Sequence, residues 1–267
     1  MYQSHWGLQK SPFRGCLDPE LFFESPGHGE ALARMQFLVE NRRRVGLLTG
    51  IAGSGKSMLL EVLAEQYRRQ GQPAAKIDLI GLEPAEMLAT LAVGLELNVD
   101  PTDSMGLLWR AVTDRLTEYR FRRLNTAILL DDADRASQPV LDQITRLAQH
   151  DRSPESRVTL ILAGQRQRIG RLGDTLLGLA ELRIEVEPWE EPETAEFLKT
   201  SLARAGRESP VFDDSAVALL HELTHGIPRR VSQLADLSLV AGAGAGLDTI
   251  DAEVIESVYH ELGMVEV

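Results

Sequence analysis

Cysteine is nearly missing from this chain of 267 residues, because Cys16 is the only one. A single cysteine excludes an internal disulfide and a zinc site built on cysteines. A catalytic thiol has no support either, so we interpret Cys16 as an ordinary small side chain. Long apolar runs are missing as well, since no stretch approaches the roughly 18 residues that a membrane span needs. We therefore expect no direct membrane insertion.

A targeting signal and an excess of positive charge are also missing. The opening MYQSHWGLQKSPFRG lacks the long apolar core of a secretory signal, which predicts a cytoplasmic protein. The chain has 40 acidic and 28 basic residues, and its formal net charge is −12. This balance argues against a protein whose whole surface attracts nucleic acid or anionic membrane. Local basic patches remain compatible with it.

Apolar strands alternate with helices in the larger, N-terminal part of the chain. Strands are predicted at 45–50, 74–80, 126–132, 157–164 and 182–188, and helices at 57–71, 84–94, 105–123 and 140–150. Strands separated by helices predict a parallel sheet that is covered on both faces. The last strand, LRIEVEP, alternates apolar and polar residues and ends at Pro188, as a strand at or near a sheet edge does.

The chain after EPWEEPE reads as helices throughout. They are predicted at 193–206, 213–225, 228–241 and 252–262, with starts marked by Pro192, the run DDS and Pro228. The AGAGAG stretch is interpreted as a helix end and a loop. A small all-helical C-terminal domain is therefore predicted to follow the α/β domain.

The run GIAGSGKS is the strongest signal and fits the pattern G-x-x-x-x-G-K-[ST]. It follows an apolar strand and opens a helix, as a phosphate cradle requires, because glycines let backbone N–H groups close around the phosphates. Lys56 would reach the β- and γ-phosphates of a nucleotide, and Ser57 would ligate Mg²⁺. The alternative is a glycine-rich turn without a ligand. The predicted binding residues are Gly50, Ile51, Ala52, Gly53, Ser54, Gly55, Lys56, Ser57 and Met58.

The run AILLDDADRA ends an apolar strand on two adjacent aspartates, Asp131 and Asp132. In a P-loop protein such a strand presents a carboxylate to the metal or its water shell, so Asp131 is the predicted Mg²⁺ partner. Two anions beside a nucleotide are tolerable because the metal and basic groups offset them. The alternative is that both aspartates cap the following helix. Asp134 fits that local capping role better.

The opening MYQSHWGLQKSPFRGCLDPELFFESPGHGEAL, followed by GLLTGIAGSGKS, resembles the AAA+ ATPases related to ExeA/GspA of the general secretion pathway. The resemblance continues through LLDDAD, LILAGQ, LRIEVEPW and HGIPRR, and so covers essentially the whole chain. It implies an α/β P-loop NTPase with a parallel sheet sandwiched by helices and a helical lid. It also implies ATP and Mg²⁺ as cofactors and hydrolysis to ADP and phosphate. The corresponding boundaries are 1–44 for an N-terminal arm and helix within the ATPase module, 45–188 for the core and 189–267 for the lid.

Two features depart from that family. Asp132 stands where AAA+ ATPases usually carry a glutamate that orients and polarises the attacking water. Aspartate is one methylene shorter, and catalytic placement tolerates little displacement, so Asp132 marks either a slow base or a nucleotide-holding switch. The chain also ends after the lid, without the transmembrane and peptidoglycan-binding regions of the secretion proteins. The main rival is therefore a DNA-transposition regulator of the MuB/TniB kind.

The resemblance implies three further catalytic residues. Gln165 ends the strand VTLILAG where AAA+ proteins place a polar sensor of the γ-phosphate, with simple solvation as the alternative. Arg229 in GIPRR resembles the sensor-2 arginine at the start of a lid helix, and its rigid fork of donors would point at the phosphates. Arg183 lies where clamp-loader-like ATPases put an arginine finger that acts on the neighbouring subunit's nucleotide. The competing arginines are Arg166, Arg168, Arg171 and, beside the sensor-2 position, Arg230.

An arginine supplied by a neighbour would make hydrolysis depend on assembly, so a homo-oligomer, either a ring or a filament, is expected. The second expected partner is a secretion- or membrane-associated protein. DNA is the less favoured partner. The basic runs NRRRVG, YRFRRLN and RQRIGR could contact phosphates if they converged on a pore or groove, although each also lies near a predicted helix end, where arginine favours the helix dipole.

Two other features have modest interpretations. The N-terminal arm is expected to wrap the sheet edge and help close the adenine pocket, with simple apolar packing of WGLQKSPF as the alternative. His221 and His225 lie four residues apart in one predicted helix, a spacing that can bind metal, but the sequence offers no third ligand.

Overall fold

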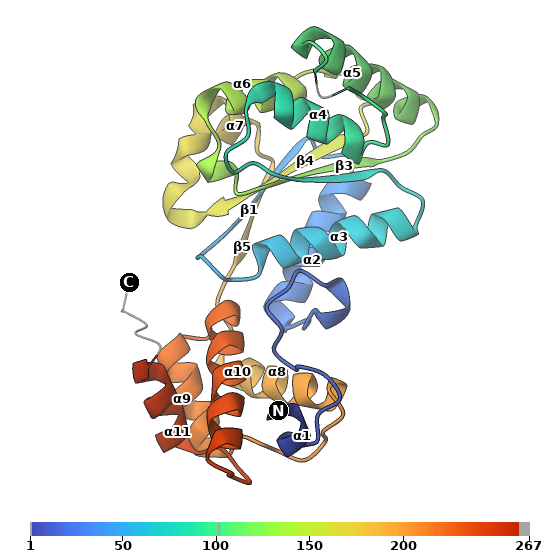
Figure 1. Ribbon diagram of the computed structural model, residues 1–267. Coiled ribbons are helices and arrows are strands. Elements are labelled where there is room, and N and C mark those ends of the chain that lie inside the picture. The colour runs from blue at the N-terminus through green and yellow to red at the C-terminus, as the bar shows by residue number, and fades with distance from the viewer. Residues whose placement is uncertain (1, 101, 262–267) are drawn as a thin grey trace. The chain divides into compact units, whose positions relative to one another are not determined.

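The computed structural model of the chain describes residues 2–100 and 102–261. The chain divides into two compact units, whose elements are labelled in Figure 1. The αβα unit comprises Pro26–Ala52 and Lys56–Val186. The helical unit comprises Met1–Ser25, Gly53–Gly55 and Glu187–Val267.

The αβα unit is built on a parallel sheet. Among the described residues the sheet has five strands in the order β2-β3-β4-β1-β5. Every neighbouring pair is parallel, so all strands present their carboxyl ends at one edge. The predicted edge position of the last strand is confirmed, since within the described part of the chain β5 pairs with β1 alone. The strands are β1 (Val45–Gly50), β2 (Ala74–Asp78), β3 (Thr126–Asp131), β4 (Val158–Gln165) and β5 (Leu182–Val186).

Helices cover both faces of this sheet (Figure 1), as the sequence predicts. On one face lie α2 (Pro26–Glu40) and α3 (Lys56–Arg69). The other face carries α4 (Pro84–Gly94), α5 (Met105–Phe121), α6 (Gln138–Ala148) and α7 (Gly173–Leu179). Short 3-10 helices, η2 (Ala133–Arg135) and η3 (Arg166–Leu172), follow the carboxyl ends of β3 and β4.

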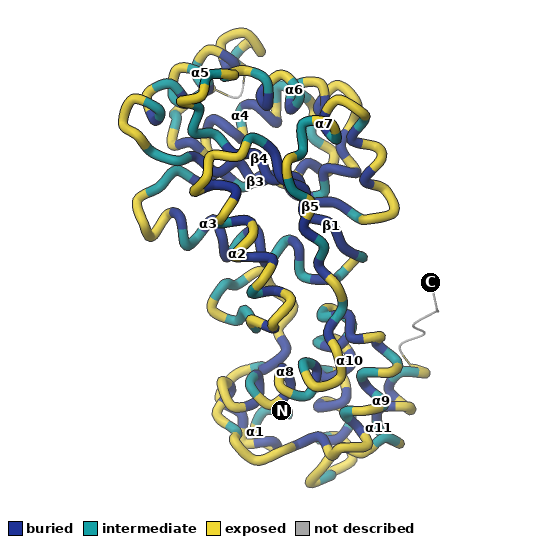
Figure 2. The backbone as a smooth tube through the Cα atoms, turned by 180° about the vertical axis from the view of Figure 1, so that it is seen from behind, coloured by how far each residue is buried: buried dark blue, intermediate teal, exposed yellow. Residues whose placement is uncertain are grey.

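Burial on both faces explains why the central strands are continuous apolar runs. All six residues of β1 and of β3 are buried, as the tube in Figure 2 shows for the interior of this unit. Successive residues of a strand point to opposite faces. Ile128 and Leu130 therefore join the core beneath α4, α5 and α6, while Leu129 is buried on the other side.

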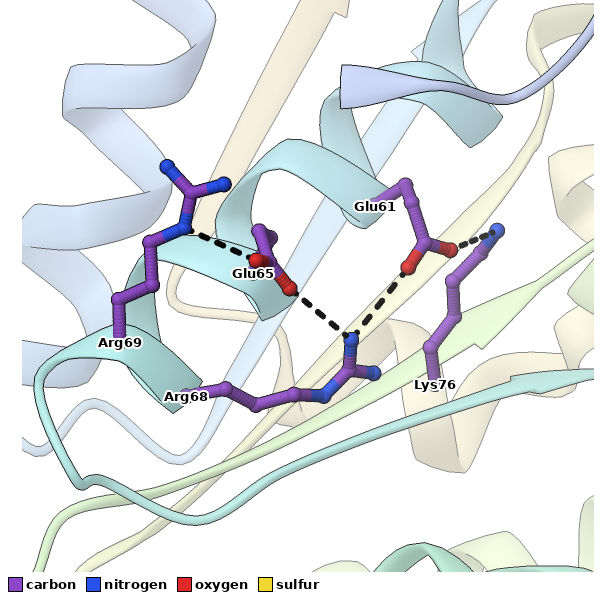
Figure 3. A network of polar contacts seen from close by, with 5 residues as sticks. All are labelled: Glu61, Glu65, Arg68, Arg69 and Lys76. Atoms are coloured by element: carbon purple, nitrogen blue, oxygen red, sulfur yellow. Dashed lines mark hydrogen bonds and ion pairs between the residues drawn. The ribbon is translucent and has the colours of Figure 1, made fainter. Parts of the chain in front are cut away.

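Polar contacts also join α3 to the sheet (Figure 3). The ammonium group of Lys76 in β2 lies 3.0 Å from a carboxylate oxygen of Glu61, and Arg68 lies 3.5 Å from the other oxygen. Arg68 and Arg69 also reach Glu65, at 3.8 and 2.9 Å. These arginines are thus engaged with acids on their own helix.

The helical unit consists of the C-terminal helices and the N-terminal arm. The side chain of Asp213 accepts a hydrogen bond from the N–H of Ala216 at 2.8 Å, which caps α9. Pro228 occupies the first turn of α10, where its missing N–H costs nothing. The elements are α1 (Tyr2–Trp6), η1 (Pro19–Leu21), α8 (Glu191–Arg204), α9 (Asp214–Thr224), α10 (Pro228–Gly244) and α11 (Ala252–Glu261).

The N-terminal arm packs into the core of the helical unit. The indole N–H of Trp6 donates to the carbonyl of Leu239 at 2.8 Å, and the N–H of Gln9 donates to the carbonyl of Ala205 at 2.8 Å. Trp6 and Phe13 are buried in this core. The apolar-packing alternative for WGLQKSPF is therefore confirmed. The arm's first 25 residues group with the C-terminal helices, whereas the sequence assigns 1–44 to the ATPase module.

Two stretches differ from the sequence predictions. Helix α10 continues to Gly244, three residues beyond the predicted end, so the first four residues of AGAGAG are helical. Helix α7 is not predicted, because GDTLLGL is short and follows a run read as a basic cluster. Among the described residues, none of the helices combines the length and the apolar character needed to cross a membrane.

Candidate functional site

The P-loop joins β1 to α3 at the carboxyl edge of the sheet. Gly53 and Gly55 have φ values of 84° and 96°, conformations that glycine adopts at little cost and other residues rarely adopt. The ammonium group of Lys56 donates to the carbonyls of Gly50 at 3.1 Å and Ile51 at 2.7 Å. Lys56 is buried at the start of α3, so its charge is held beside the loop. Loop geometry and lysine placement are those of a phosphate cradle.

A cluster of aspartates lies at the same edge. Asp131 is 6% exposed, and one of its carboxylate oxygens accepts the N–H of Asp132 at 3.0 Å. Asp78 ends the neighbouring strand β2 and pairs in register with Asp131. Asp78 is not among the site residues predicted from the sequence. Its signal is present, however, because it ends an apolar strand as Asp131 does.

Asp132 sits in a strained and crowded position. Its φ of 49° lies in the left-handed region, which costs a non-glycine residue free energy. Burial, and then the charges of Asp131, Asp78 and Asp134, raise the pKa of the Asp132 carboxyl above its usual range. Its side chain makes no capping hydrogen bond to η2, so the capping alternative is wrong for Asp132.

Asp134 is fully buried and braces the end of β4. One of its oxygens accepts the N–H of Gln165 at 3.2 Å, while the other has no hydrogen-bond partner among the described residues. A Cβ on Gly164 would lie 2.8 Å from Asp134 Oδ1, so only glycine fits there without movement. The predicted local capping role of Asp134 is therefore wrong, because its carboxylate turns to the neighbouring strand rather than to its own helix.

The carboxyl edge also brings Gln165 beside the P-loop. Gln165 ends β4 and pairs in register with Gly50, the first residue of the loop. It is only partly buried, which leaves its side chain accessible. Three separate segments of the sequence thus meet at this edge: the P-loop, the aspartate run and the end of β4.

Arg183 lies on the edge strand β5, where it pairs in register with Leu47. Its Nε donates to the hydroxyl of Thr49 at 3.4 Å, and its side chain is exposed. Arg166, one of its competitors, forms an ion pair with Glu185. Arg183 is therefore placed at the surface of the αβα unit.

Arg229 lies in the first turn of α10, in the helical unit, which also includes the P-loop residues Gly53–Gly55. Within that unit the N–H of Arg229 donates to the carbonyl of Gly53 at 3.3 Å. A Cβ on Gly53 would come within 3.0 Å of the Cβ of Arg229. Close approach to Arg229 thus also favours glycine at position 53, in addition to its positive φ.

Oxygen donors at the edge suit Mg²⁺. Ser57 offers a hydroxyl from the first turn of α3, and Asp131 and Asp78 offer carboxylates. Over residues 2–100 and 102–261 no group of three or more His, Cys, Asp and Glu side chains could hold a metal alone. Nucleotide phosphates would complete the shell, in the manner usual for Mg²⁺.

The ring Nδ1 of His221 lies 3.0 Å from the hydroxyl of Thr194.

Comparison with known proteins agrees with this geometry. General secretion pathway protein A of Aeromonas hydrophila is 26% identical over 250 residues, which cover 92% of this chain and 46% of that relative. Cdc6p of Pyrobaculum aerophilum superposes with a TM-score of 0.73 at 18% identity, covering 96% and 72% of the two chains. The Orc1 protein of Aeropyrum pernix, solved in complex with DNA, gives 0.68 at 20% identity, covering 92% and 68%. The two superpositions establish a shared fold.

The resemblance seen in the opening and the P-loop is confirmed by the match to General secretion pathway protein A. This chain spans less than half of that relative. The family described as "AAA domain" matches residues 39–172, half of the 267 residues, from the end of α2 through the P-loop and both aspartates to η3. The chain therefore belongs to the AAA domain family.

Proposed function

We propose that this protein binds ATP with Mg²⁺ on Gly50–Met58 and hydrolyses it to ADP and phosphate. The observation that supports this most is the meeting of the P-loop, Asp131 and Gln165 at one edge of the sheet. Lys56 would bind the β- and γ-phosphates, and Ser57 and Asp131 would hold the metal. Mg²⁺ would neutralise charge that develops on the phosphates. Gln165 would hydrogen-bond the γ-phosphate or the attacking water.

Asp132 would act as the base that orients and polarises this water. Burial and then the neighbouring aspartates raise its pKa, and a bound Mg²⁺ would offset that negative charge. Arg229 would sense the phosphates from the lid helix α10. Arg183, exposed on β5, would act as a finger on the nucleotide of a neighbouring subunit.

Hydrolysis would then couple to self-assembly in a ring or filament. The assembly would remodel or regulate a second protein, and the name of the secretion relative suggests a secretion- or membrane-associated partner. We place this assembly in the cytoplasm. The domain roles follow the predicted boundaries, with the core at 45–188 and the lid at 189–267.

A hydrolysis-poor nucleotide switch is the second candidate, because Asp132 is short, crowded and held at a φ of 49°. The test is the Mg²⁺-dependent hydrolysis rate per subunit over a wide range of protein concentration. A rate that rises and reaches a plateau would support an assembly-dependent ATPase. Intact ATP binding without turnover at any concentration would support the switch. Absence of ATP binding would contradict both.

Assemblies that mix two variants test whether Arg183 is the arginine finger. Arg183→Ala subunits keep their P-loop, and Lys56→Ala subunits keep their arginine, so a mixture restores sites with both groups if Arg183 acts in trans. We expect the mixture to exceed the summed rates of the two separate variants. Arg168→Ala mixed with Lys56→Ala is the matched control. A rate that stays at the sum would remove Arg183 from this role.

A further inference from the structure

Arginines gather at the amino edge of the sheet, at the opposite ends of the strands from the P-loop. Arg44 directly precedes β1 and Arg157 directly precedes β4, while Arg123 lies three residues before β3. Because β3 pairs with β4 and β4 pairs with β1, these starts lie side by side. At about 3.3 Å per residue, the length of the strands separates this edge from the carboxyl edge by about 20 Å.

We call this surface the arginine edge. Its members come from the end of α2, the end of α5 and the loop between α6 and β4. They are Arg42, Arg43, Arg44, Arg120, Arg122, Arg123, Arg152 and Arg157. Two of the three basic runs in the sequence, NRRRVG and YRFRRLN, thus converge. The third, RQRIGR, follows the carboxyl end of β4 and lies at the other edge.

Part of this positive charge is not neutralised by the protein. Arg43 pairs with Glu181 at 3.2 Å, Arg120 with Asp151 at 3.0 Å and Arg122 with Glu118 at 3.4 Å. Within the described ranges the other five make no ion pair; they are Arg42, Arg44, Arg123, Arg152 and Arg157.

The unpaired arginines also crowd one another. Burial, and then the charges of Arg42 and Arg123, lower the pKa of the Arg157 guanidinium, while the charge of Glu155 acts in the opposite direction. Arg42 and Arg123 therefore each lie within electrostatic reach of Arg157. Like charges held close together are unfavourable. An anionic ligand would relieve this repulsion.

Two of these arginines occupy positions that favour glycine. Arg42 follows α2 with a φ of 55° and Arg123 follows α5 with a φ of 59°. Each N–H bonds back to the preceding turn, Arg42 to Val39 at 3.1 Å and Arg123 to Arg120 at 3.0 Å, as in the usual glycine-ended helix. Other helix ends of this chain use glycine at that position, at Gly71, Gly206 and Gly246. Glu96 and His225 are further non-glycine cases. Arginine in place of glycine after α2 and after α5 therefore lowers local stability, and it supplies positive charge at this edge.

The surface between the arginines is hollow. A cavity of about 470 Å³ is lined by Arg42, Arg44, Arg152, Ser153, Ser156 and Glu181, among others. A second cavity of about 170 Å³, lined in part by Arg120, His150 and Arg157, shares Val158 with the first. Forked donors and hydroxyls around a hollow match the geometry of phosphate oxygens, which arginine can bind in pairs.

An aromatic side chain projects from the same edge. Phe121 is 78% exposed at the end of α5, between Arg120 and Arg122 in the sequence. The guanidinium carbon of Arg120 lies 5.7 Å from its ring centroid. An exposed ring on a surface that also carries unpaired arginines is the combination on which bases stack while the backbone is held electrostatically.

We propose that the arginine edge binds single-stranded nucleic acid, with the unpaired arginines on the phosphates and Phe121 stacked on a base. The aspartates of the carboxyl edge do not oppose this, because the Debye length near 0.15 M salt is about 8 Å and they lie about 20 Å away. A concave surface with one projecting ring suits a strand with unpaired bases better than a flat anionic membrane. This surface does not depend on the ATP site.

The test is the anisotropy of fluorescein-labelled oligothymidine, titrated with the full chain at several salt concentrations. We expect binding that weakens with salt, and a loss of at least about tenfold for the triple variant Arg42→Glu, Arg123→Glu, Arg157→Glu. The matched control, Arg34→Glu, Arg68→Glu, Arg69→Glu, makes the same charge change at exposed arginines of α2 and α3 and should keep the affinity within about twofold. Phe121→Ala should weaken binding by about fivefold or more without changing the salt slope.

A double variant distinguishes weaker binding caused by lost charge from weaker binding caused by misfolding. Arg42→Gly with Arg123→Gly removes both side chains but suits the backbone, so it should hold or raise the midpoint of thermal unfolding while weakening binding. Equal losses in the edge and control triples would overturn the proposal. So would absence of binding at low salt, or tighter binding to duplex DNA, a polyglutamate peptide or phosphatidylserine vesicles than to oligothymidine.

Discussion

The two edges of one parallel sheet carry opposite charge. The carboxyl edge gathers Asp78, Asp131, Asp132 and Asp134, and the amino edge gathers arginines. In both places burial and then neighbouring like charges disfavour the charged form, so the pKa of Asp132 is raised and that of Arg157 is lowered. The acidic carboxyl edge therefore favours a positively charged ligand, and the basic amino edge favours a negatively charged one. A cation with its nucleotide suits the first edge, and a polyanion suits the second.

The edges differ in how they are built. At the carboxyl edge, buried side chains hold the groups in place, since Asp131 and Asp134 are 6% and 0% exposed. At the amino edge the charged groups are mostly exposed and extend from helix ends. Chemistry that tolerates little displacement needs the first arrangement. Binding of a flexible polymer is served by the second.

The largest effect is expected from removing the ammonium group of Lys56 at the carboxyl edge. Lys56→Ala should lower kcat/KM for ATP by about 10²–10³, because a charge that stabilises the phosphates is lost. Steady-state hydrolysis and ATP binding measure this change. Lys199→Ala, an exposed lysine of α8, is the control and should keep the rate. Equal rates for Lys56→Ala and the original protein would contradict the role of the P-loop.

Packing behind the carboxyl edge can be broken without touching charge. Gly164→Ala should lower the free energy of unfolding by about 1–3 kcal/mol, because the new methyl group meets the carboxylate of Asp134 at 2.8 Å. Urea denaturation measures this loss. Gly170→Ala serves as the control, because a Cβ on Gly170 would meet no atom of the described residues within 4 Å. Similar stabilities for the two variants would show that Asp134 moves freely.

The proposed Mg²⁺ site is tested by replacing one carboxylate oxygen of Asp131 with an amide nitrogen. Asp131→Asn should raise the Mg²⁺ concentration for half-maximal hydrolysis about tenfold or more, since an amide is a weaker ligand than a carboxylate. Chelation of Mg²⁺ by EDTA should abolish turnover of both proteins. Asp174→Asn, an aspartate of α7 outside the site, is the control. An unchanged Mg²⁺ dependence would remove Asp131 from the metal site.

The smallest effect is expected at the amino edge. Arg42→Gly should raise the free energy of unfolding by about 0.5–1 kcal/mol, because glycine adopts a φ of 55° with little strain. Arg34→Gly within α2 should have the opposite sign, since glycine disfavours a helix interior. Denaturant unfolding of both variants gives the comparison. A loss of stability in Arg42→Gly would mean that the arginine contributes to folding and would weaken the argument that it is kept for charge.

Much of the carboxyl edge could be predicted from the sequence. Strands β1 and β3 are buried on both faces, so they appear as continuous apolar runs, and the residues directly after each run must lie at the edge. The P-loop and Asp131 could be found for that reason. Asp134 could not, because its partner is the N–H of Gln165, which is 31 residues away and is brought close only by the pairing of β4 with β3.

Other features depended on distant partners as well. The N-terminal arm looks like part of the ATPase module by its position in the chain, yet Trp6 bonds to Leu239, 233 residues away. Helix α7 was missed because its short apolar stretch is stabilised by the core beneath α6 rather than by its own periodicity.

The sequence by itself determined the local structure: the phosphate-binding loop, whose glycines fix the backbone, the apolar strands, and the helix starts at Asp213 and Pro228. Tertiary structure alone decided which distant residues meet. It paired Asp78 with Asp131, joined Asp134 to Gln165, and brought Arg42, Arg123 and Arg157 from three segments to one edge. The physical reason is that propensity and apolar periodicity act between near neighbours along the chain, whereas strand order sets which ends lie together in space.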